Sequence, residues 1–202
     1  MKKFLALGDS YTIGEGVPPE ERWPVRLARL LRGEGIAVAS PRILATTGWT
    51  TGELMAGIRE ASLEPGYDLV SLLIGVNNQY RGWSLQIYRR EFADLLEQAT
   101  AFARGVPQRV VVLSIPDWSV TPFAEADPRG RAAIAREIEA FNAANREETL
   151  KRGAHYVDIT PLSRQHGEKW LASDGLHPSG EMYRAWAEQV LPVAREILYT
   201  EH

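Results

Sequence analysis

Ser10 stands directly after a short apolar run and a glycine, where a serine hydroxyl could act as a nucleophile. Residues 4–7 show no polar alternation, which predicts a strand buried on both faces, and Gly8 permits a sharp exit from it. A serine just past such a strand is held by a rigid element while its side chain stays clear of the core. The pair Asp9-Ser10 equally fits the cap of a following helix. Ser10 therefore needs a base, an orienting acid and oxyanion donors elsewhere in the chain.

An acid and an imidazole stand three residues apart near the other end of the chain, at Asp174 and His177. Gly175 allows a tight turn between them, and Pro178 is suited to open a final helix. A carboxylate beside an imidazole fixes its tautomer and stabilises the imidazolium that forms when the ring accepts a proton. A surface turn with a helix cap would use the same residues. The other histidines are weaker candidates, beside a strand, in a polar loop and at the C-terminus: His155, His166 and His202.

Two further residues could donate to a developing negative charge. Asn77 directly follows an apolar run, so its side-chain amide can face an oxyanion, although an Asx turn after a strand uses the same residue type. Gly48 lies among threonines and would offer a backbone N–H that no side chain shields, or serve simply as a turn. Each residue alone leaves both interpretations open.

Apolar runs and helical stripes alternate along the chain, and these elements must position the candidates. Strands apolar on both faces, separated by helices, predict a parallel sheet sandwiched between helices. The second strand is the least clear, because Pro41 splits two extended segments, which suggests an edge or bent strand. Pro192 predicts a kink in the last helix. The expected strands are residues 4–7, 36–39 with 42–45, 69–74, 110–113 and 156–159, and the expected helices lie near 23–31, 52–60, 84–102, 134–141 and from 178 onward.

The expected sheet predicts where a site can lie. In an open doubly wound sheet, ligands bind outside the carboxyl ends of the strands. Ser10, Gly48 and Asn77 each follow an expected strand, and the pair Asp174 and His177 follows the last one. Residues from opposite ends of the chain should therefore meet on one rim of the sheet.

Composition narrows the class of protein and its partners. The 202 residues are 45% hydrophobic and 24% charged, which suffices for one domain over residues 1–202, and no linker or repeat marks a boundary. A net charge of -3 gives no electrostatic reason to expect nucleic acid or anionic lipid as a partner. The sequence contains no cysteine, which excludes disulfides and thiol catalysis. The apolar run after Lys3 is too short for a signal peptide and no run is long enough for a membrane span, so we expect a cytoplasmic chain.

Four blocks of this sequence resemble those of the SGNH, or GDSL, hydrolase family, and they occur in the family's order. The resemblance covers essentially the whole chain; its first and last blocks are the most specific and the second is the least. It implies a three-layer α/β/α fold with a flavodoxin-like five-stranded parallel sheet, and a serine esterase that hydrolyses carboxylic esters. The blocks are Gly8-Asp9-Ser10-Tyr11, Gly48, Gly75-Val76-Asn77 and Asp174-Gly175-Leu176-His177-Pro178.

The resemblance also implies a role for each candidate residue. Ser10 would be the nucleophile, His177 its base and Asp174 the partner of the base, with an acyl-enzyme as the intermediate. The oxyanion hole would consist of the backbone N–H groups of Ser10 and Gly48 and the side chain of Asn77. No metal or organic cofactor is needed for this chemistry.

Asn78 marks one departure from the family pattern, because the family usually has Asp there. A carboxylate that normally anchors this loop is therefore missing, and we count Asn78 among the possible pocket residues. The loop of residues 116–130 is long enough to overhang the site, so Trp118 and Phe123 could line an acyl pocket. The expected partner is a small-molecule acyl ester; short acyl esters, acetylated sugars, thioesters and lysophospholipids stay open. Three residues just after the third block could contact an alcohol or a polar head group: Tyr80, Arg81 and Trp83.

Two other classes of protein compete with the esterase. A flavodoxin-like module without catalysis could bind phosphate at the same rim, but Asp9 and Glu15 stand where phosphate favours N–H groups and positive charge, and no P-loop lysine is present. A metal-dependent phosphohydrolase could use Asp9, Asp174 and His177 as ligands. A catalytic pair of metals normally needs more carboxylates and histidines than this rim offers.

Overall fold

Within residues 1–199, which the computed structural model of the protein describes, five strands form one sheet. Their spatial order is β2-β1-β3-β4-β5, and every neighbouring pair is parallel. This is the order of flavodoxin-like sheets, whose ligands bind where the strand order reverses, beside the first and third strands. The strands are β1 (Phe4–Gly8), β2 (Arg42–Ala45), β3 (Leu69–Leu73), β4 (Val110–Leu113) and β5 (His155–Val157).

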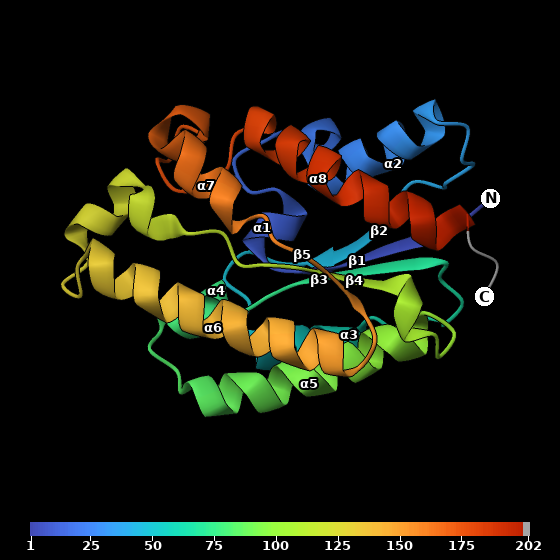
Figure 1. Ribbon diagram of the computed structural model, residues 1–202, viewed down its shortest axis with the longest axis horizontal. Coiled ribbons are helices and arrows are strands. Elements are labelled where there is room, and N and C mark those ends of the chain that lie inside the picture. Colours follow the sequence, from blue (N-terminus) through green and yellow to red (C-terminus); the bar gives the residue numbers. More distant parts are fainter. Residues whose placement is uncertain (200–202) are drawn as a thin grey trace.

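Helices connect the strands and cover both faces of the sheet. The α-helices are α1 (Ser10–Ile13), α2 (Trp23–Gly33), α3 (Thr51–Glu60), α4 (Val76–Tyr80), α5 (Leu85–Phe102), α6 (Arg131–Lys151), α7 (Thr160–His166) and α8 (Gly180–Tyr199). Short 3₁₀ helices lie in the connections: η1 (Pro19–Glu21), η2 (Pro107–Arg109), η3 (Trp118–Val120), η4 (Pro122–Ala126) and η5 (Gly167–Trp170). α2 and α8 pack against each other on one face, and α3, α5 and α6 lie on the other, so the predicted three-layer α/β/α fold is confirmed (Figure 1).

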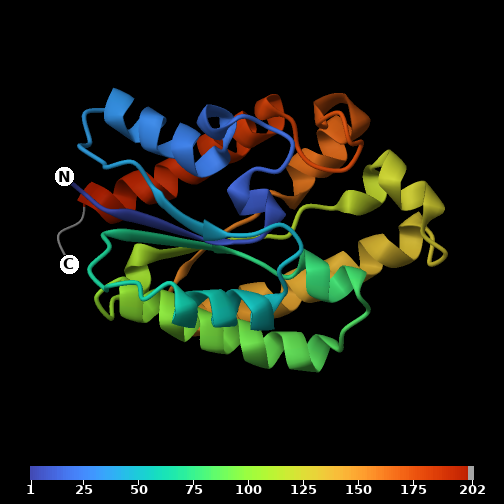
Figure 2. The ribbon, with the colours of Figure 1, turned by 180° about the vertical axis from the view of Figure 1, so that it is seen from behind.

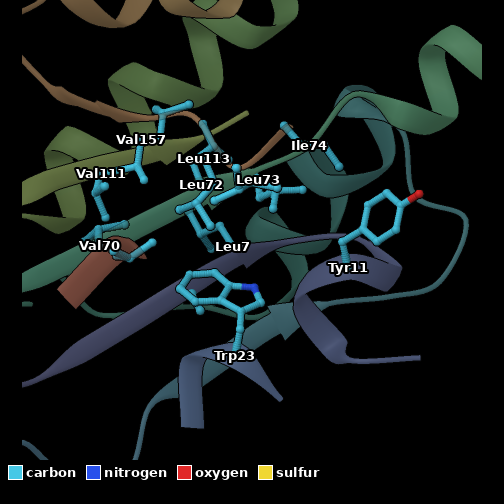
Figure 3. Packing of buried hydrophobic residues seen from close by; sticks show 14 of the residues in the cluster. Leu7, Tyr11, Trp23, Val70, Leu72, Leu73, Ile74, Val111, Leu113 and Val157 are labelled. Atoms are coloured by element: carbon cyan, nitrogen blue, oxygen red, sulfur yellow. The ribbon is translucent and has the colours of Figure 1, made fainter. Parts of the chain in front are cut away.

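The core holds the central strands rigidly. Every residue of β1 and β3 is buried, because a parallel sheet covered by helices on both faces leaves neither face in water. Leu7 and Leu72 are partners in the register of these two strands, and Figure 3 shows them among the aliphatic side chains of the sheet with Trp23 of α2 close by. Burying one such side chain contributes about 1.5–3 kcal/mol. The carboxyl ends of β1 and β3 therefore form a firm base for the loops that follow.

Some elements differ from the sequence prediction. Of the two extended segments around Pro41, only Arg42–Ala45 is a strand, and it lies at the edge of the sheet as expected; residues 36–39 contribute a single bridge, between Lys2 and Val38. α8 continues through Pro192 and begins at Gly180. The sequence prediction gave α1 only as the alternative in which Asp9 or Ser10 caps a helix, and it missed α4 and α7. These three helices have 4, 5 and 7 residues and are too short to show a helical period.

α1, α4 and α7 all lie at the end of the sheet opposite the N-terminus (Figures 1 and 2). α1 follows β1 after one residue, and α4 follows β3 after two residues. The predicted rim is therefore built largely from short helices rather than from open loops. In the part of the chain that the structure describes, none of the helices has both the length and the apolar character needed to cross a membrane.

Candidate active site

Ser10 is the first residue of α1, at the point where β1 ends. Asp9 caps this helix, because its Oδ1 accepts a hydrogen bond from the backbone N–H of Tyr11 at 3.0 Å. A Cβ on Gly8 would meet the Thr12 hydroxyl and lie 2.5 Å from the carbonyl oxygen of Leu73, so only glycine fits there. The helix-cap interpretation of the pair is thus confirmed for Asp9, and Ser10 stands just inside the helix.

Asp9, the residue before Ser10, is completely buried. Its Oδ2 has no hydrogen-bond partner among the described residues. Burial raises the pKa of this carboxyl group from 3.8 to about 7, against the hydrogen bond from Tyr11, which lowers it. Asp9 does not line the cavity described below. Within residues 1–199 no group of three His, Asp or Glu side chains is arranged to hold a metal ion.

Asp174 and His177 form a compact acid–imidazole pair. His177 Nδ1 lies 2.6 Å from Asp174 Oδ2, and Asp174 Oδ1 accepts from the backbone N–H groups of Leu176 and His177, both at 2.9 Å. Partial burial alone would raise the pKa of Asp174, but the hydrogen bonds from the His177 ring and from these two N–H groups hold the pKa below its usual value. The carboxylate therefore stays ionised beside the ring and leaves Nε2 of His177 as the nitrogen that can accept a proton.

The loop that carries this pair closes on itself through backbone contacts. Leu171 and Pro178 form an antiparallel bridge, and the N–H of Ala172 donates to the carbonyl of His177 at 2.8 Å. Pro178 was expected to open the final helix, but it belongs to this bridge, and the helix begins only at Gly180. The Tyr11 ring meets the His177 ring edge-on, with centroids 6.0 Å apart, and so connects the two ends of the chain.

One cavity of about 190 Å³ brings the predicted residues together. Ser10, Gly48, Asn77 and His177 all line it, and Asp174 lies behind His177. The sequence analysis did not assign the remaining cavity residues to the pocket. Each of them is a chain neighbour of Ser10, Gly48, Asn77 or His177, and this adjacency is the signal that could have found them. These additional lining residues are Tyr11, Thr47, Val76 and Leu176.

Asn77 lies on α4, which follows β3, and Gly48 lies in the turn after the edge strand β2. One N–H of the Asn77 side chain donates to the carbonyl of Trp49 at 2.9 Å, which leaves the second N–H of this amide available. Gly48 has a φ of +87°, a left-handed conformation that favours glycine. Its carbonyl accepts from Arg81 Nη2 at 2.7 Å, so Arg81 faces this turn; its expected contact with a substrate head group stays a prediction.

Asn78 does not line the cavity, so the expectation that it belongs to the pocket is wrong. Its side chain is completely buried, where Oδ1 accepts from the Thr51 N–H at 3.1 Å and Nδ2 donates to the Thr51 hydroxyl at 2.7 Å. The Thr51 hydroxyl in turn donates to Glu91 of α5. Position 78 lacks the carboxylate that the family usually has there, and Glu91 of α5 supplies a carboxylate to Thr51 instead. The Asn78–Thr51 hydrogen bonds keep α4 anchored to the start of α3.

Three aromatic rings form one wall of the cavity. The centroids of Tyr80 and Trp118 are 5.7 Å apart, those of Trp118 and Phe123 are 5.9 Å apart, and those of Tyr80 and Phe123 are 6.1 Å apart. Trp118 is buried and its Nε1 donates to Gln79 Oε1 at 2.8 Å, whereas Tyr80 and Phe123 are exposed at 47% and 42%. This wall gives the cavity a largely apolar lining. Trp83 is not among the cavity residues.

Of the weaker histidine candidates, His155 and His166 do not line the cavity. His155 lies in β5, and the ring of His166 stacks on Trp170 with centroids 3.4 Å apart. His202 lies outside the described residues.

Comparisons with known proteins identify one family. Residues 6–185 match the model of the GDSL-like lipase/acylhydrolase family. An arylesterase from Vibrio mimicus is 24% identical over 205 residues, which cover 98% of this chain and 88% of that protein.

Several solved structures have the same fold and align with this chain over almost the full length of both proteins. The structure of TesA has a TM-score of 0.75 and 20% identity, covering 97% of this chain and 99% of that one. The lipase/acylhydrolase from Enterococcus faecalis has a TM-score of 0.76 and 18% identity, covering 100% of both chains. Phospholipase A1 from Streptomyces albidoflavus NA297 has a TM-score of 0.69 and 21% identity, covering 96% of this chain and 98% of that one.

Proposed function

The chain belongs to the GDSL-like lipase/acylhydrolase family and is a carboxylic ester hydrolase, and from this premise we propose that Ser10, His177 and Asp174 form its catalytic triad. The observation that carries the proposal is the short Asp174–His177 bond, with His177 and Ser10 lining the same cavity. A hydroxyl, an imidazole and an ionised carboxylate at one cavity are the groups that nucleophilic acyl transfer requires.

The reaction follows from these roles. Ser10 Oγ attacks the acyl carbon while Nε2 of His177 takes the hydroxyl proton, and Asp174 stabilises the resulting imidazolium. The carbonyl oxygen becomes an oxyanion, for which the N–H groups of Ser10 and Gly48 and the Asn77 amide are the proposed donors. Collapse breaks the ester bond, and His177 returns the proton to the departing alcohol. Water then attacks the acyl-enzyme with His177 as the base, which releases the acid and restores Ser10.

The shape and lining of the cavity favour a small apolar acyl group. A volume of about 190 Å³ lies below the roughly 300–1,000 Å³ of sites that enclose drug-sized ligands. The aromatic wall offers rings to an acyl chain or an aryl group, and no Asp, Glu, Lys or Arg side chain among the described residues lines the cavity. We therefore propose short acyl esters as substrates in preference to long lipids.

A fluorophosphonate probe tests the nucleophile and its base together. We expect a single adduct on Ser10, located by peptide mass analysis, no adduct in Ser10→Ala, and much slower labelling in His177→Ala. Ser84→Ala is the matched control, because Ser84 caps α5 and does not line the cavity. Labelling that persists in Ser10→Ala would remove Ser10 from the chemistry.

A panel of nitrophenyl esters tests the substrate class. We expect kcat/KM to be highest for short acyl chains and to fall once the chain exceeds the cavity. Activity on these esters that survives a chelator, without hydrolysis of nitrophenyl phosphate, separates the serine mechanism from the metal-dependent alternative. A preference for long chains would contradict the proposed size of the acyl group.

A further inference from the structure

The two outer donors proposed for the oxyanion come from different elements. Gly48 lies in the turn after β2, an edge strand whose first residue is exposed, whereas Asn77 lies on α4, which follows the buried strand β3. Stabilisation of an oxyanion depends on donors that are already in place before the reaction. Some contact must therefore fix the turn at Gly48 relative to α4.

Side chains from α4 and its C-terminal cap supply that contact. Asn77 donates to the carbonyl of Trp49 at 2.9 Å, and Arg81 Nη2 donates to the carbonyl of Gly48 at 2.7 Å. Asn77 and Arg81 are separated by one helical turn, so both side chains reach the same neighbouring segment. Two consecutive carbonyls are thus held by one face of the helix, with the buried pair Asn78 and Thr51 beside them.

The guanidinium of Arg81 bridges two parts of this segment. Its Nη1 lies 3.3 Å from Glu53 Oε2, and Glu53 itself completes the capping box of α3 with Thr50. A planar guanidinium presents donors in a fixed fork, so one side chain can serve the Gly48 carbonyl and the Glu53 carboxylate at once. Arg81 does not line the cavity. Its position therefore suits support of the turn and not contact with substrate.

The turn needs such support because of its central residue. The N–H of Trp49 donates to the carbonyl of Thr46 at 3.2 Å, and Gly48 has a φ of +87°, the pattern of a type II turn with glycine at its third position. Glycine restricts its own backbone less than any other residue. The direction of the Gly48 N–H therefore depends on the contacts that hold the turn, which include the Thr46–Trp49 bond inside it and the Arg81 contact from outside.

We propose that Arg81 is a positioning residue of the oxyanion hole, which holds the Gly48 turn against α4 so that the Gly48 N–H and the Asn77 amide face the same point. The proposal deepens the proposed function and rests on it. Arg81 acts through Gly48, so its loss should lower kcat while KM for a short ester changes little.

The test compares Arg81→Met with Glu53→Gln. Arg81→Met keeps the length of the side chain but removes every donor, and we expect kcat to fall about 10- to 100-fold, less than loss of a donor itself, since a displacement of about 1 Å is worth up to about 100-fold. Glu53→Gln keeps the Arg81–Gly48 bond and should retain kcat within about 3-fold. A combined Arg81→Met/Asn77→Ala variant should lose less than the product of the two single effects, because both act on one group of donors.

A second measurement protects the test against misfolding. In Arg81→Ala, methylguanidinium added to the assay should restore part of kcat, whereas the same ion should not restore Asn77→Ala. Wild-type kcat in Arg81→Met, with Ser10 still labelled by fluorophosphonate, overturns the role of Arg81 and leaves the esterase mechanism standing. Absence of Ser10 labelling in the wild-type protein overturns both.

Discussion

The two halves of the proposed active site, the oxyanion side and the base side, are held in place by different means. On the oxyanion side, Asn78 and Thr51 are completely buried, and side chains from α4 reach across to another segment of the chain. On the base side, the Asp174 side chain is 41% exposed, and its hydrogen bonds go to residues two and three positions further along the chain. One half is fixed by contacts between distant segments, and the other by its own local turn.

The chemistry explains this difference. Donors that stabilise an oxyanion must not move when charge develops, because reorganisation would consume the stabilisation they provide. The base must take a proton from one group, return it to another and then activate water, which requires access to solvent. His177 meets this need, because its ring lines an open cavity while Asp174 fixes its other nitrogen. Substitutions at Asp174, Asn77 and Asn78 probe the two halves, and a further one probes the buried carboxyl group of Asp9.

The largest effect is expected from Asp174→Asn on the base side. Asp174 Oδ1 accepts two backbone N–H groups, so asparagine must keep its oxygen there and turn its NH₂ toward His177 Nδ1. That arrangement makes Nδ1 an acceptor and places the ring proton on Nε2, the nitrogen that should act as the base. We expect kcat to fall about 10⁴-fold with the fold retained. Ester kinetics together with thermal unfolding check this, and a loss below tenfold would show that the ring does not depend on Asp174.

Asn77→Ala is expected to have the next largest effect, on the oxyanion side. Loss of one such donor costs about 2.7–4 kcal/mol, or roughly 10²–10³ in kcat. The variant also loses the bond to the Trp49 carbonyl, so its melting temperature is measured alongside. Turnover near that of the wild type, in a folded variant, would remove Asn77 from the site.

The same contrast decides what the sequence could predict. The Asp174–His177 pair is local, so a five-residue motif was enough to propose it, and Ser10 was placed by the buried strand before it. The supports of the oxyanion side join residues 27 to 40 positions apart, such as Asn78 with Thr51 and Thr51 with Glu91, and no local pattern reveals them. For that reason the sequence prediction assigns Asn78 to the pocket, although its side chain is buried. It also does not find the contact between Arg81 and the Gly48 turn.

Asp9→Asn tests the buried carboxyl group next to Ser10 through the pH dependence of the free energy of unfolding. Because burial raises the pKa of Asp9 from 3.8 to about 7, the folded protein holds this proton between those values while the unfolded chain has lost it. Stability due to Asp9 therefore falls as pH rises, by about 2 kcal/mol between pH 5 and pH 7. Asparagine keeps the cap to the Tyr11 N–H but does not titrate, so the variant should gain stability relative to the wild type over this range.

Asp174 provides a control, because its effect on stability changes with pH in the opposite direction to that of Asp9. Its pKa lies below the usual value, so its contribution to stability is present above the unfolded pKa and is lost as the pH falls through the folded one. Urea unfolding at several pH values should therefore show Asp9→Asn gaining on the wild type as pH rises, and Asp174→Asn gaining on it only at acidic pH. Parallel curves for the wild type and Asp9→Asn would mean that Asp9 is already ionised at pH 5.

The smallest effect is expected from exchanging the carboxylate between positions 78 and 91. The single proton of the Thr51 hydroxyl now goes to Glu91, while Asn78 Nδ2 donates to the Thr51 oxygen. Asn78→Asp removes that donor and leaves two carboxylates competing for one proton, which should lower the free energy of unfolding by about 1–3 kcal/mol.

In Asn78→Asp/Glu91→Gln the direction reverses: the hydroxyl donates to the new aspartate and the glutamine NH₂ donates to the Thr51 oxygen. Urea unfolding should then show a favourable coupling of about 0.5–3 kcal/mol between the two changes. Strictly additive effects would mean that Glu91 does not substitute for the missing aspartate.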